Sequence, residues 1–313
     1  MRLLVTGGAG YIGRVVTDQL ALAGHEVVVL DNLSASRSEK LPATVRLYVG
    51  DVGDRDLLDR VLPHIDAVLH FAASIEVGES MAQPMKHFQN NVATTLRLLE
   101  AMLDHNVHRF IFSSTAAIYG NPQSNQVAED HPLRPSNPYG ESKLMVERIL
   151  GWLHDRNGLR YVSLRYFNAA GGILNRRATN LIPIVLEVAK GLRPHVEIFG
   201  TDYPTRDGTA VRDYVHVEDL AAAHLLALQT LDTRSRAVYN LGNGLGFTVK
   251  EVIEVARKVT GHPIPVLEAP RRPGDPAEMI ASSELIRKEL GWTPRYSELE
   301  SIVRSAWENQ VPA

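Results

Sequence analysis

Short apolar runs alternate with longer helical patterns through the first half of the chain. The runs are rich in Val, Ile, Leu and Phe without polar alternation, which is typical of strands buried on both faces of a parallel sheet. They lie at Leu3–Thr6, Glu26–Leu30, Val45–Val49, Ala67–Phe71, Phe110–Ser114 and Tyr161–Arg165. Helical patterns separate them at Gly13–Ala23, Arg55–Leu62, Pro84–His105 and Tyr139–Arg156. This order predicts an α/β fold, a doubly wound, Rossmann-type parallel sheet.

The pattern becomes irregular after Phe167, where residues 169–210 and 260–280 carry many Gly, Pro and Arg residues. Later elements are expected as strands at Val215–Val217 and Val238–Leu241, and as helices at Val217–Leu231 and Ser297–Asn309. We therefore expect a main domain over 1–168 with later returns at about 211–241. A smaller, discontinuous C-terminal lobe is expected mainly from 169–210 and 242–313.

Composition narrows the class of protein. The 313 residues are 44% hydrophobic and 22% charged, with a net charge of −3. This is typical of a soluble globular protein and lacks the basic surface of nucleic-acid binders. The absence of cysteine excludes disulfides and thiolate metal sites. No apolar run reaches the roughly 18 residues that span a bilayer, and no secretion signal precedes the first strand. We expect a cytoplasmic protein that binds no nucleic acid, membrane or metal.

A glycine turn follows the first predicted strand, with glycines at Gly7, Gly10 and Gly13. They suit a tight turn, a close backbone approach to a pyrophosphate, and close helix–strand packing, respectively. An ordinary strand–helix turn would also favour glycine. Asp31, however, ends the second strand about 20 residues later, where an acid hydrogen-bonds the ribose hydroxyls of NAD. Because this acid would repel a 2′-phosphate and no Arg follows before Arg37, the sequence favours NAD over NADP.

Other strand ends carry further candidates. Asp51, followed by Val52, could meet the adenine edge, or Asp51 could cap the next helix. His70 is expected to be structural, and the small residues after Phe71 would let a dinucleotide lie close to the sheet. A hydroxyl at Thr115 could bond both a substrate oxygen and a neighbouring phenol, although such hydroxyls often satisfy only local backbone groups.

The segment from Asn137 to Lys143 is the strongest chemical signal. Asn137 can cap a helix whose first position suits Pro138. Tyr139 and Lys143 then share a helix face, because residues four apart are neighbours. A nearby positive charge lowers the pKa of a phenol, which could then act as a general base near neutral pH. Tyr-x-x-x-Lys also occurs by chance on amphipathic helices, so the pair depends on its surroundings.

Together, the glycine turn, Asp31, Thr115 and the Tyr139–Lys143 pair resemble an extended short-chain dehydrogenase/reductase. Longer runs resemble the UDP-glucose 4-epimerase family in particular, and the resemblance extends nearly end to end. These runs begin at Asp31, His70, Val77, Asn90, Arg165, Phe199, Val211, Tyr239 and Arg271.

The resemblance implies a tightly bound NAD and epimerisation at C4 of a UDP-hexose through a transient 4-keto sugar. It implies that Tyr139 is the acid/base, that Lys143 holds the nicotinamide ribose and lowers the pKa of Tyr139, and that Thr115 completes the catalytic set. The residues implied in cofactor binding are Gly7, Gly10, Tyr11, Ile12, Gly13, Asp31, Asn32, Ser34, Asp51, Val52, Phe71, Ala72, Ala73, Asn90, Ser113, Tyr139, Lys143 and Tyr166.

The resemblance places the nucleotide half of the substrate in the second lobe. Arg212 and Arg272 would bind the diphosphate, which suits the planar guanidinium. The full implied substrate set is Thr115, Tyr139, Asn168, Asn180, Phe199, Arg212, Arg272, Asp275 and Met279. Homodimerisation, through the helices at Pro84–His105 and Tyr139–Arg156, is likewise implied.

Three departures from the family pattern bear on the substrate. Ile75 stands where several relatives carry Lys near the cofactor phosphates. The stretch from Asn168 to Asn180 is short. Met279 occupies the position that gates the 2-substituent of the sugar, and methionine adapts its volume. UDP-N-acetylglucosamine therefore stays open as a substrate. UDP-glucuronate also stays open because Arg176 and Arg177 lie in the short stretch.

Other functions are less favoured. A 4,6-dehydratase would need an acid/base pair after Thr115, where Ala116 and Ala117 stand. A non-catalytic NAD sensor would have no need of Tyr139 and Lys143. A serine hydrolase has no nucleophile elbow to support it.

Overall fold

The computed structural model describes residues 1–35, 41–124, 126–172, 180–272 and 274–309. Its chain forms two compact units, each made of three stretches. The first unit contains Met1–Tyr119, Leu133–Arg165 and Ala221–Tyr239. The second contains Gly120–Pro132, Tyr166–Leu220 and Asn240–Ala313. This division differs from the expected one, because residues 120–132, 166–168, 211–220 and 240–241 group with the second unit.

A seven-stranded sheet forms the centre of the first unit, in the order β12-β7-β5-β4-β1-β2-β3. The strands are β1 (Arg2–Thr6), β2 (Glu26–Asp31), β3 (Arg46–Val49), β4 (Ala67–His70), β5 (Arg109–Thr115), β7 (Arg160–Tyr166) and β12 (Arg236–Leu241). The order reverses beyond β1, and the pairs β1–β2, β1–β4, β2–β3 and β4–β5 are parallel. The predicted doubly wound sheet is therefore confirmed.

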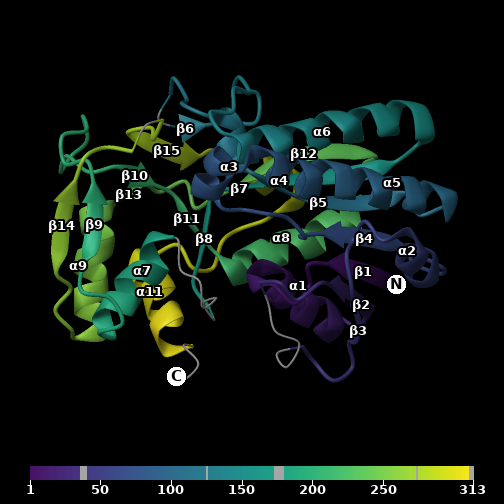
Figure 1. Ribbon diagram of the computed structural model, residues 1–313, viewed down its shortest axis with the longest axis horizontal. Coiled ribbons are helices and arrows are strands. Elements are labelled where there is room, and N and C mark those ends of the chain that lie inside the picture. Colours follow the sequence, from purple (N-terminus) through teal and green to yellow (C-terminus); the bar gives the residue numbers. More distant parts are fainter. Residues whose placement is uncertain (36–40, 125, 173–179, 273, 310–313) are drawn as a thin grey trace. The chain divides into compact units, whose positions relative to one another are not determined.

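Helices flank this sheet (Figure 1). They are α1 (Tyr11–Leu22), α2 (Arg55–Val61), α3 (Val77–Ala82), α4 (Pro84–Phe88), α5 (Thr94–Asp104), α6 (Pro138–Asn157) and α8 (Val217–Thr230). A π-helical turn, η2 (Gln89–Ala93), joins α4 to α5, and a 3-10 turn, η3 (Ala116–Tyr119), follows β5. A π turn inserts one residue into the helical register and is frequent at functional sites.

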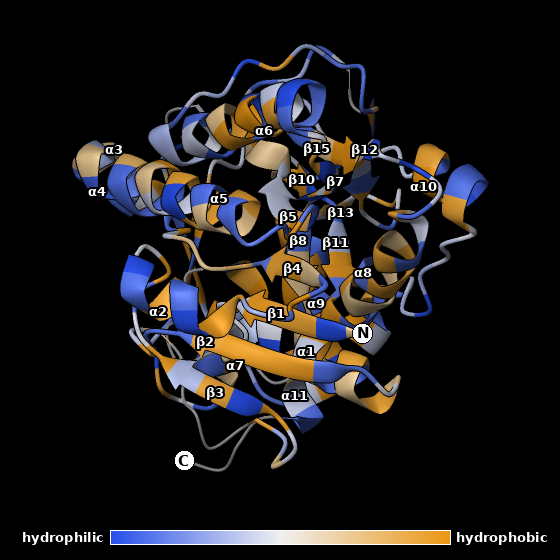
Figure 2. Cartoon of the chain, turned by 90° about the vertical axis from the view of Figure 1, so that its right-hand side faces the viewer, coloured by the Kyte–Doolittle hydropathy of each residue, from blue (hydrophilic) through white to orange (hydrophobic). Residues whose placement is uncertain are grey.

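One row of apolar side chains runs across the sheet. Leu4 is paired in register with Val28 and with Val68, and Val68 is paired with Phe110. All four are essentially inaccessible to solvent and belong to one core with apolar residues of α2, α5 and α6. Figure 2 shows β1 and β2 as strongly hydrophobic ribbons. Burial on this scale, at about 25 cal/mol per Å² of apolar area, is the main stabilisation of the unit.

In its described residues, the second unit is built from short strands and helices. Its four-stranded sheet has the order β13-β10-β15-β6, and β11 pairs with β8 and β14 with β9 in separate two-stranded sheets. The strands are β6 (Gln126–Val127), β8 (Asn168–Ala170), β9 (Val196–Phe199), β10 (Val211–Arg212), β11 (Tyr214–His216), β13 (Phe247–Thr248), β14 (Val266–Ala269) and β15 (Glu278–Ala281). The helices are α7 (Leu181–Ala189), α9 (Val249–Thr260), α10 (Glu284–Leu290) and α11 (Leu299–Glu308).

The strand expected at Val215–Val217 largely corresponds to β11, which is not part of the seven-stranded sheet. β11 instead hydrogen-bonds to β8, with Tyr214 opposite Asn168. β12 does return to the seven-stranded sheet, as expected. Within the described ranges, no helix is both long and apolar enough to cross a membrane.

Candidate active site

The glycine turn lies against the end of β4. Gly7 has φ +70°, and a Cβ there would stand 2.6 Å from the Ala72 nitrogen, so both conformation and space require glycine. A Cβ on Gly13 would stand 2.3 Å from the Gly7 carbonyl oxygen. The turn and the first helical turn of α1 therefore pack as closely as the sequence predicts.

The N-terminus of α1 suits an anion. Gly10 is the N-cap and carries no side chain to bond the first N–H groups, and the first turn contains no acid. Tyr11 and Ile12 open the helix, so their backbone N–H groups lie at its positive end. Phosphate groups bind at such helix ends, and these residues fit the pyrophosphate of NAD.

Asp31 is held beside this turn at the end of β2. Its carboxylate accepts hydrogen bonds from the backbone N–H of Ala9 at 3.0 Å and of Leu33 at 2.8 Å. The loop continues through Leu33, whose φ of +57° is unusual for a non-glycine residue. Asn32 then accepts a bond from the Ser34 N–H at 3.0 Å. The acid is therefore fixed beside the glycine turn, where a ribose hydroxyl of NAD would meet it.

Strand register brings the predicted edge residues together. Thr6 is paired with both Leu30 and His70, and His70 is paired with Phe112. The residues that follow these four positions therefore lie at the same edge of the sheet. They are Gly7, Asp31, Phe71 with Ala72 and Ala73, and Ser113. Ligands of open α/β sheets bind at this carboxyl edge.

His70 is structural, as expected. It is buried, and its Nδ1 is 2.6 Å from the Thr6 hydroxyl while its Nε2 is 3.0 Å from that of Thr95. The Thr95 hydroxyl donates to the Asn91 carbonyl oxygen, so it accepts from Nε2–H and leaves Nδ1 to accept from Thr6. Burial, with a smaller contribution from the Lys143 charge, lowers the pKa of His70 to about 3.

The alternative role considered for Asp51, a helix cap, is wrong. Asp54 caps α2 by accepting from the Leu57 N–H. Asp51 instead accepts from the Gly53 N–H at 2.7 Å, which forms a turn of its own, and Val52 beside it is buried. Its predicted contact with adenine stays a prediction.

Helix α6 begins as the sequence predicts. The Asn137 side chain accepts from the Gly140 N–H at 2.8 Å, and Pro138 occupies the first helical position. A Cβ on Gly140 would stand 2.6 Å from the Ala117 carbonyl oxygen, so the first turn of α6 packs against η3. Tyr139 and Lys143 are thereby placed next to the end of β5.

Tyr139, Lys143 and Thr115 come together in the first unit. The Tyr139 phenol is hydrogen-bonded to the Thr115 hydroxyl, which also accepts from the Ala117 N–H at 3.2 Å. Lys143 is buried, its Nζ donates to the Ser113 carbonyl oxygen at 2.8 Å, and it lies 4.8 Å from the Phe112 ring centroid. Thr115 therefore contacts the phenol and also satisfies a local backbone group, while its bond to a substrate oxygen stays a prediction.

The electrostatics differ from the expectation that Lys143 lowers the pKa of Tyr139. Burial raises the pKa of Tyr139, and the hydrogen bond from Thr115 opposes that rise. Burial also lowers the pKa of Lys143 to about 7, with Glu147 opposing. Desolvation is thus the largest influence on the pKa of both side chains.

Asn90 and Asn91 lie on the π turn η2. Asn91 exchanges hydrogen bonds with the Ser74 backbone at 2.7 and 2.9 Å and donates to the Ser142 hydroxyl at 3.0 Å. Asn90 donates to the Ser74 hydroxyl at 3.0 Å. The extra residue of the π turn brings both amides to the loop that precedes Ile75, whose side chain is largely exposed.

The predicted substrate residues of the second unit form two pairs. The Arg272 guanidinium stacks on the Phe199 ring, 3.8 Å from its centroid. Arg212 donates to the carbonyl oxygens of Val211 and Pro276 at 2.9 Å and lies 3.9 Å from the Asp275 carboxylate. The two arginines expected to bind a diphosphate therefore lie on neighbouring segments of one unit.

Other predicted residues of this unit are dispersed. Met279 is paired in register with Arg212, which places the proposed gate beside the arginine. Asn168 donates to the Asp213 carbonyl oxygen at 2.9 Å, Asn180 is the exposed N-cap of α7, and Tyr166 is buried at the end of β7. Arg176 and Arg177 lie outside the described residues.

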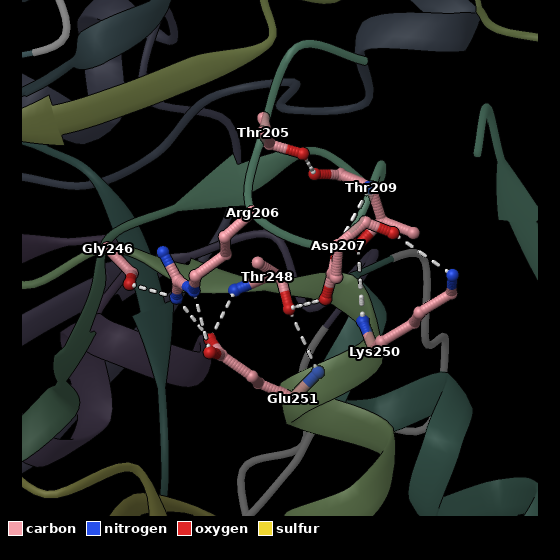
Figure 3. Close-up of polar contacts among 8 residues, drawn as sticks. All are labelled: Thr205, Arg206, Asp207, Thr209, Gly246, Thr248, Lys250 and Glu251. Carbon is pink, nitrogen blue, oxygen red and sulfur yellow. Dashed lines mark hydrogen bonds and ion pairs between the residues drawn. The ribbon is translucent and has the colours of Figure 1, made fainter. Parts of the chain in front are cut away.

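The loop between Phe199 and Arg212 is anchored to the start of α9 (Figure 3). Asp207 accepts from Thr209 through both its N–H and its hydroxyl, and from the Thr248 hydroxyl. Burial alone would raise the pKa of Asp207, but the bonds from Thr248 and Thr209 hold it below its usual value. Arg206 pairs with Glu251, which forms a capping box with Thr248. This network fixes the strand that carries Arg212.

A family model for the NAD dependent epimerase/dehydratase family matches residues 3–242. The chain belongs to this family. A UDP-glucose 4-epimerase from Halalkalibacterium halodurans is 52% identical over 98% of this chain and 95% of the relative.

Solved structures of this epimerase family agree. A crystal structure of a UDP-glucose 4-epimerase has a TM-score of 0.96 at 45% identity, covering 99% of this chain and 97% of that one. A UDP-glucose 4-epimerase from Bifidobacterium longum, in complex with NAD⁺ and UDP, has a TM-score of 0.93 at 40% identity, covering 99% and 98%. The predicted family and its cofactor are thereby confirmed.

Sequence reasoning missed several polar residues around the epimerase-family Tyr-Lys pair. His87 is fully buried with its ring centroid 6.4 Å from that of Tyr139, edge to face, and its Nε2 lies 3.4 Å from Glu79. Glu147 and Arg165 form a buried ion pair behind Lys143. The spacing of Glu147, one turn beyond Lys143, was a signal that could have found it.

Proposed function

We propose that this chain interconverts UDP-glucose and UDP-galactose by NAD-dependent epimerisation at C4 of the hexose, through a transient 4-keto sugar. The observation that carries the proposal is the hydrogen bond between Tyr139 and Thr115, with Lys143 next to it, at the sheet edge that carries the glycine turn and Asp31. It occurs in a chain 52% identical to a UDP-glucose 4-epimerase over nearly its whole length.

Tyr139 acts as a reversible acid/base. Its phenolate takes the proton of the sugar 4-hydroxyl when the C4–H bond breaks, and returns a proton to that oxygen when the bond forms again on the other face of the ring. The chemistry that NAD supplies when bound is the acceptance and return of the hydride at C4. Thr115 orients the phenol and the sugar oxygen, and its hydrogen bond lowers the pKa of Tyr139.

Lys143 binds the nicotinamide ribose and adds positive charge near the phenol. The cofactor residues with the clearest fit are Gly7, Gly10 and Gly13 at the pyrophosphate and Asp31 at the adenosine ribose. Because a bound cofactor would add a further positive charge, we expect the pKa of Tyr139 to fall when NAD is bound.

The second unit binds the nucleotide of the substrate. Arg212 and Arg272 bind the diphosphate, Asp275 the uridine ribose, and Phe199 stacks near uracil. Arg272 already covers Phe199, so it would give up or share this stacking when uracil arrives. Asn168 and Asn180 donate to the sugar, and Met279 limits the group at sugar C2.

The decisive experiment incubates the purified protein separately with UDP-glucose, UDP-N-acetylglucosamine and UDP-glucuronate. Product stereochemistry is read by NMR of the anomeric and C4 protons. We expect UDP-galactose from UDP-glucose. Conversion of only one of the other two sugars would show that this sugar, and not UDP-glucose, is the substrate. Conversion of none of the three would overturn the proposal.

We propose further that the protein is a cytoplasmic homodimer. Leu96 on α5 and Met145 and Trp152 on α6 expose apolar side chains, and Trp152 is 65% accessible. Exposed aromatic residues of this kind often anchor protein interfaces. Light scattering of the protein and of Trp152→Glu tests this, because a monomeric wild-type protein would contradict it.

A further inference from the structure

Glu147 continues the face of α6 that carries the catalytic pair. It follows Lys143 by four residues, as Lys143 follows Tyr139. It is buried and bonded on both carboxylate oxygens. Ser114 donates to Oε1 at 2.6 Å, while Arg165 donates to Oε1 at 3.1 Å and to Oε2 at 2.7 Å. Neither the mechanism above nor the cofactor site uses this group.

Ser114, the residue of β5 that is bonded to Glu147, lies between the two residues of β5 that contact Lys143 and Tyr139. Ser113 accepts the Lys143 Nζ through its carbonyl oxygen, and Thr115 is hydrogen-bonded to Tyr139. Ser114, between them, donates to Glu147. A single carboxylate thus ties the end of β5 to α6 where both catalytic side chains meet the strand.

Stability alone does not account for this ion pair. Replacing a buried pair by apolar residues is often neutral or stabilising, because both charges lose their hydration. Its position suggests an electrostatic role, since burial brings the pKa of Lys143 to about 7 and the charge of Glu147 opposes that fall. A small change in the field at Lys143 therefore changes its protonation at neutral pH.

The other charged and titratable groups around Lys143 come from several elements. His70 on β4 is neutral at physiological pH. Tyr139 lies on α6 itself. Arg165 on β7 is positive and also donates to the Tyr119 phenol of η3 at 2.7 Å. Glu147 is the negative group that raises the pKa of Lys143, and Arg165 partly neutralises it.

We propose that Glu147 and Arg165 are positioning residues for the catalytic pair: Glu147 keeps Lys143 protonated, and Arg165 sets how much of the carboxylate charge Lys143 experiences. The proposal rests on the proposed role of Lys143 but not on which sugar is the substrate. According to this proposal, the two residues of the ion pair shift the protonation of Lys143 in opposite directions.

The test is a pH titration of the Lys143 Cε signal by carbon NMR, on the purified protein with its bound cofactor, assigned with Lys143→Arg. Glu147→Gln removes a negative charge, so we expect the midpoint to fall by about one pH unit or more. Arg165→Gln removes a positive charge, so the midpoint rises. The alkaline limb of kcat/KM moves in the same two directions.

Two controls are used: one keeps the positive charge at position 165, and the other removes a positive charge from the surface. Arg165→Lys keeps a positive charge and loses the two-point contact, so stability falls while the midpoint stays. Arg148→Gln removes an exposed charge next to Glu147 on α6 and leaves the midpoint unchanged. A structural role alone predicts lower stability in the buried variants without opposite shifts.

Unchanged midpoints in folded Glu147→Gln and Arg165→Gln overturn the proposal, as do shifts in the same direction. If Glu147→Gln does not fold, the titrations of the Arg165 variants test the proposal instead. A rise in Arg165→Gln but not in Arg165→Lys supports the proposal, and equal behaviour overturns it. A protein inactive on all three UDP-sugars would refute the proposed function and still give a readable titration.

Discussion

The Tyr139 phenol is hydrogen-bonded to the Thr115 hydroxyl, so the catalytic helix and the end of β5 are joined through the two groups that would meet the sugar oxygen. Thr115 holds this place because its oxygen also accepts the Ala117 N–H of the following turn. The phenol is therefore oriented before any substrate arrives.

Tyr139→Phe removes the acid/base and leaves the ring in place. We expect the rate of epimerisation to fall by about 10²–10⁴-fold or more, the usual contribution of general acid–base catalysis. NAD content, read from the absorbance of cofactor released on denaturation, should stay at the wild-type level. Retained turnover would show that another group moves the proton.

Thr115→Val removes the bond that lowers the pKa of Tyr139. Because the base works in its deprotonated form, the rise of kcat/KM with pH should move to higher pH. Thr115→Ser keeps a hydroxyl and is the matched control, with a profile near that of the wild type. If the profile of Thr115→Val also stays in place, Thr115 does not act on the phenol.

Arg212→Ala should weaken UDP-sugar binding far more than NAD binding. Loss of a charged hydrogen bond costs about 1.5–3 kcal/mol, which corresponds to a roughly 10- to 100-fold weaker Kd for UDP by calorimetry. Arg193→Ala, which removes a partly exposed arginine that pairs with Glu187, is the control. Equal loss of UDP and NAD would mean that the second unit does not bind the nucleotide of the substrate.

Gly13→Ala tests the glycine turn. The new Cβ would stand 2.3 Å from a backbone oxygen, a distance that the loop can relieve only by moving. We expect loss of bound NAD with most of the secondary structure retained in circular dichroism. Gly151→Ala, on α6 with its nearest neighbour at 3.9 Å, should leave NAD content unchanged. Full NAD content in Gly13→Ala would contradict the close packing.

Local chemistry made much of the first unit predictable. Buried strands, the glycines and the Asn137 cap each have a short-range cause, and the structure has them where the sequence places them. The failures have long-range causes. Asp51 and Asp54 look alike in sequence, and only the geometry of the turn selects Asp54 as the cap. The partner of β11 depends on β8, a strand of three residues with no periodic signal.

The pairing of Glu147 with Arg165 likewise has a long-range cause. The spacing from Lys143 points to Glu147, but Arg165 lies 18 residues further along and meets it only because β7 runs beside β5. The desolvation that sets the pKa values of Tyr139 and Lys143 likewise depends on everything packed around them.

The position of β12 in the seven-stranded sheet has a consequence for synthesis of the protein. This strand lies next to β7 but comes after β8, β9, β10 and β11 in the chain. A growing chain therefore cannot complete the first sheet until residue 241 has left the ribosome. Until then β7 has an open edge, the kind of surface that pairs wrongly during folding. Chaperone dependence should thus be greatest for nascent chains that end between β7 and β12.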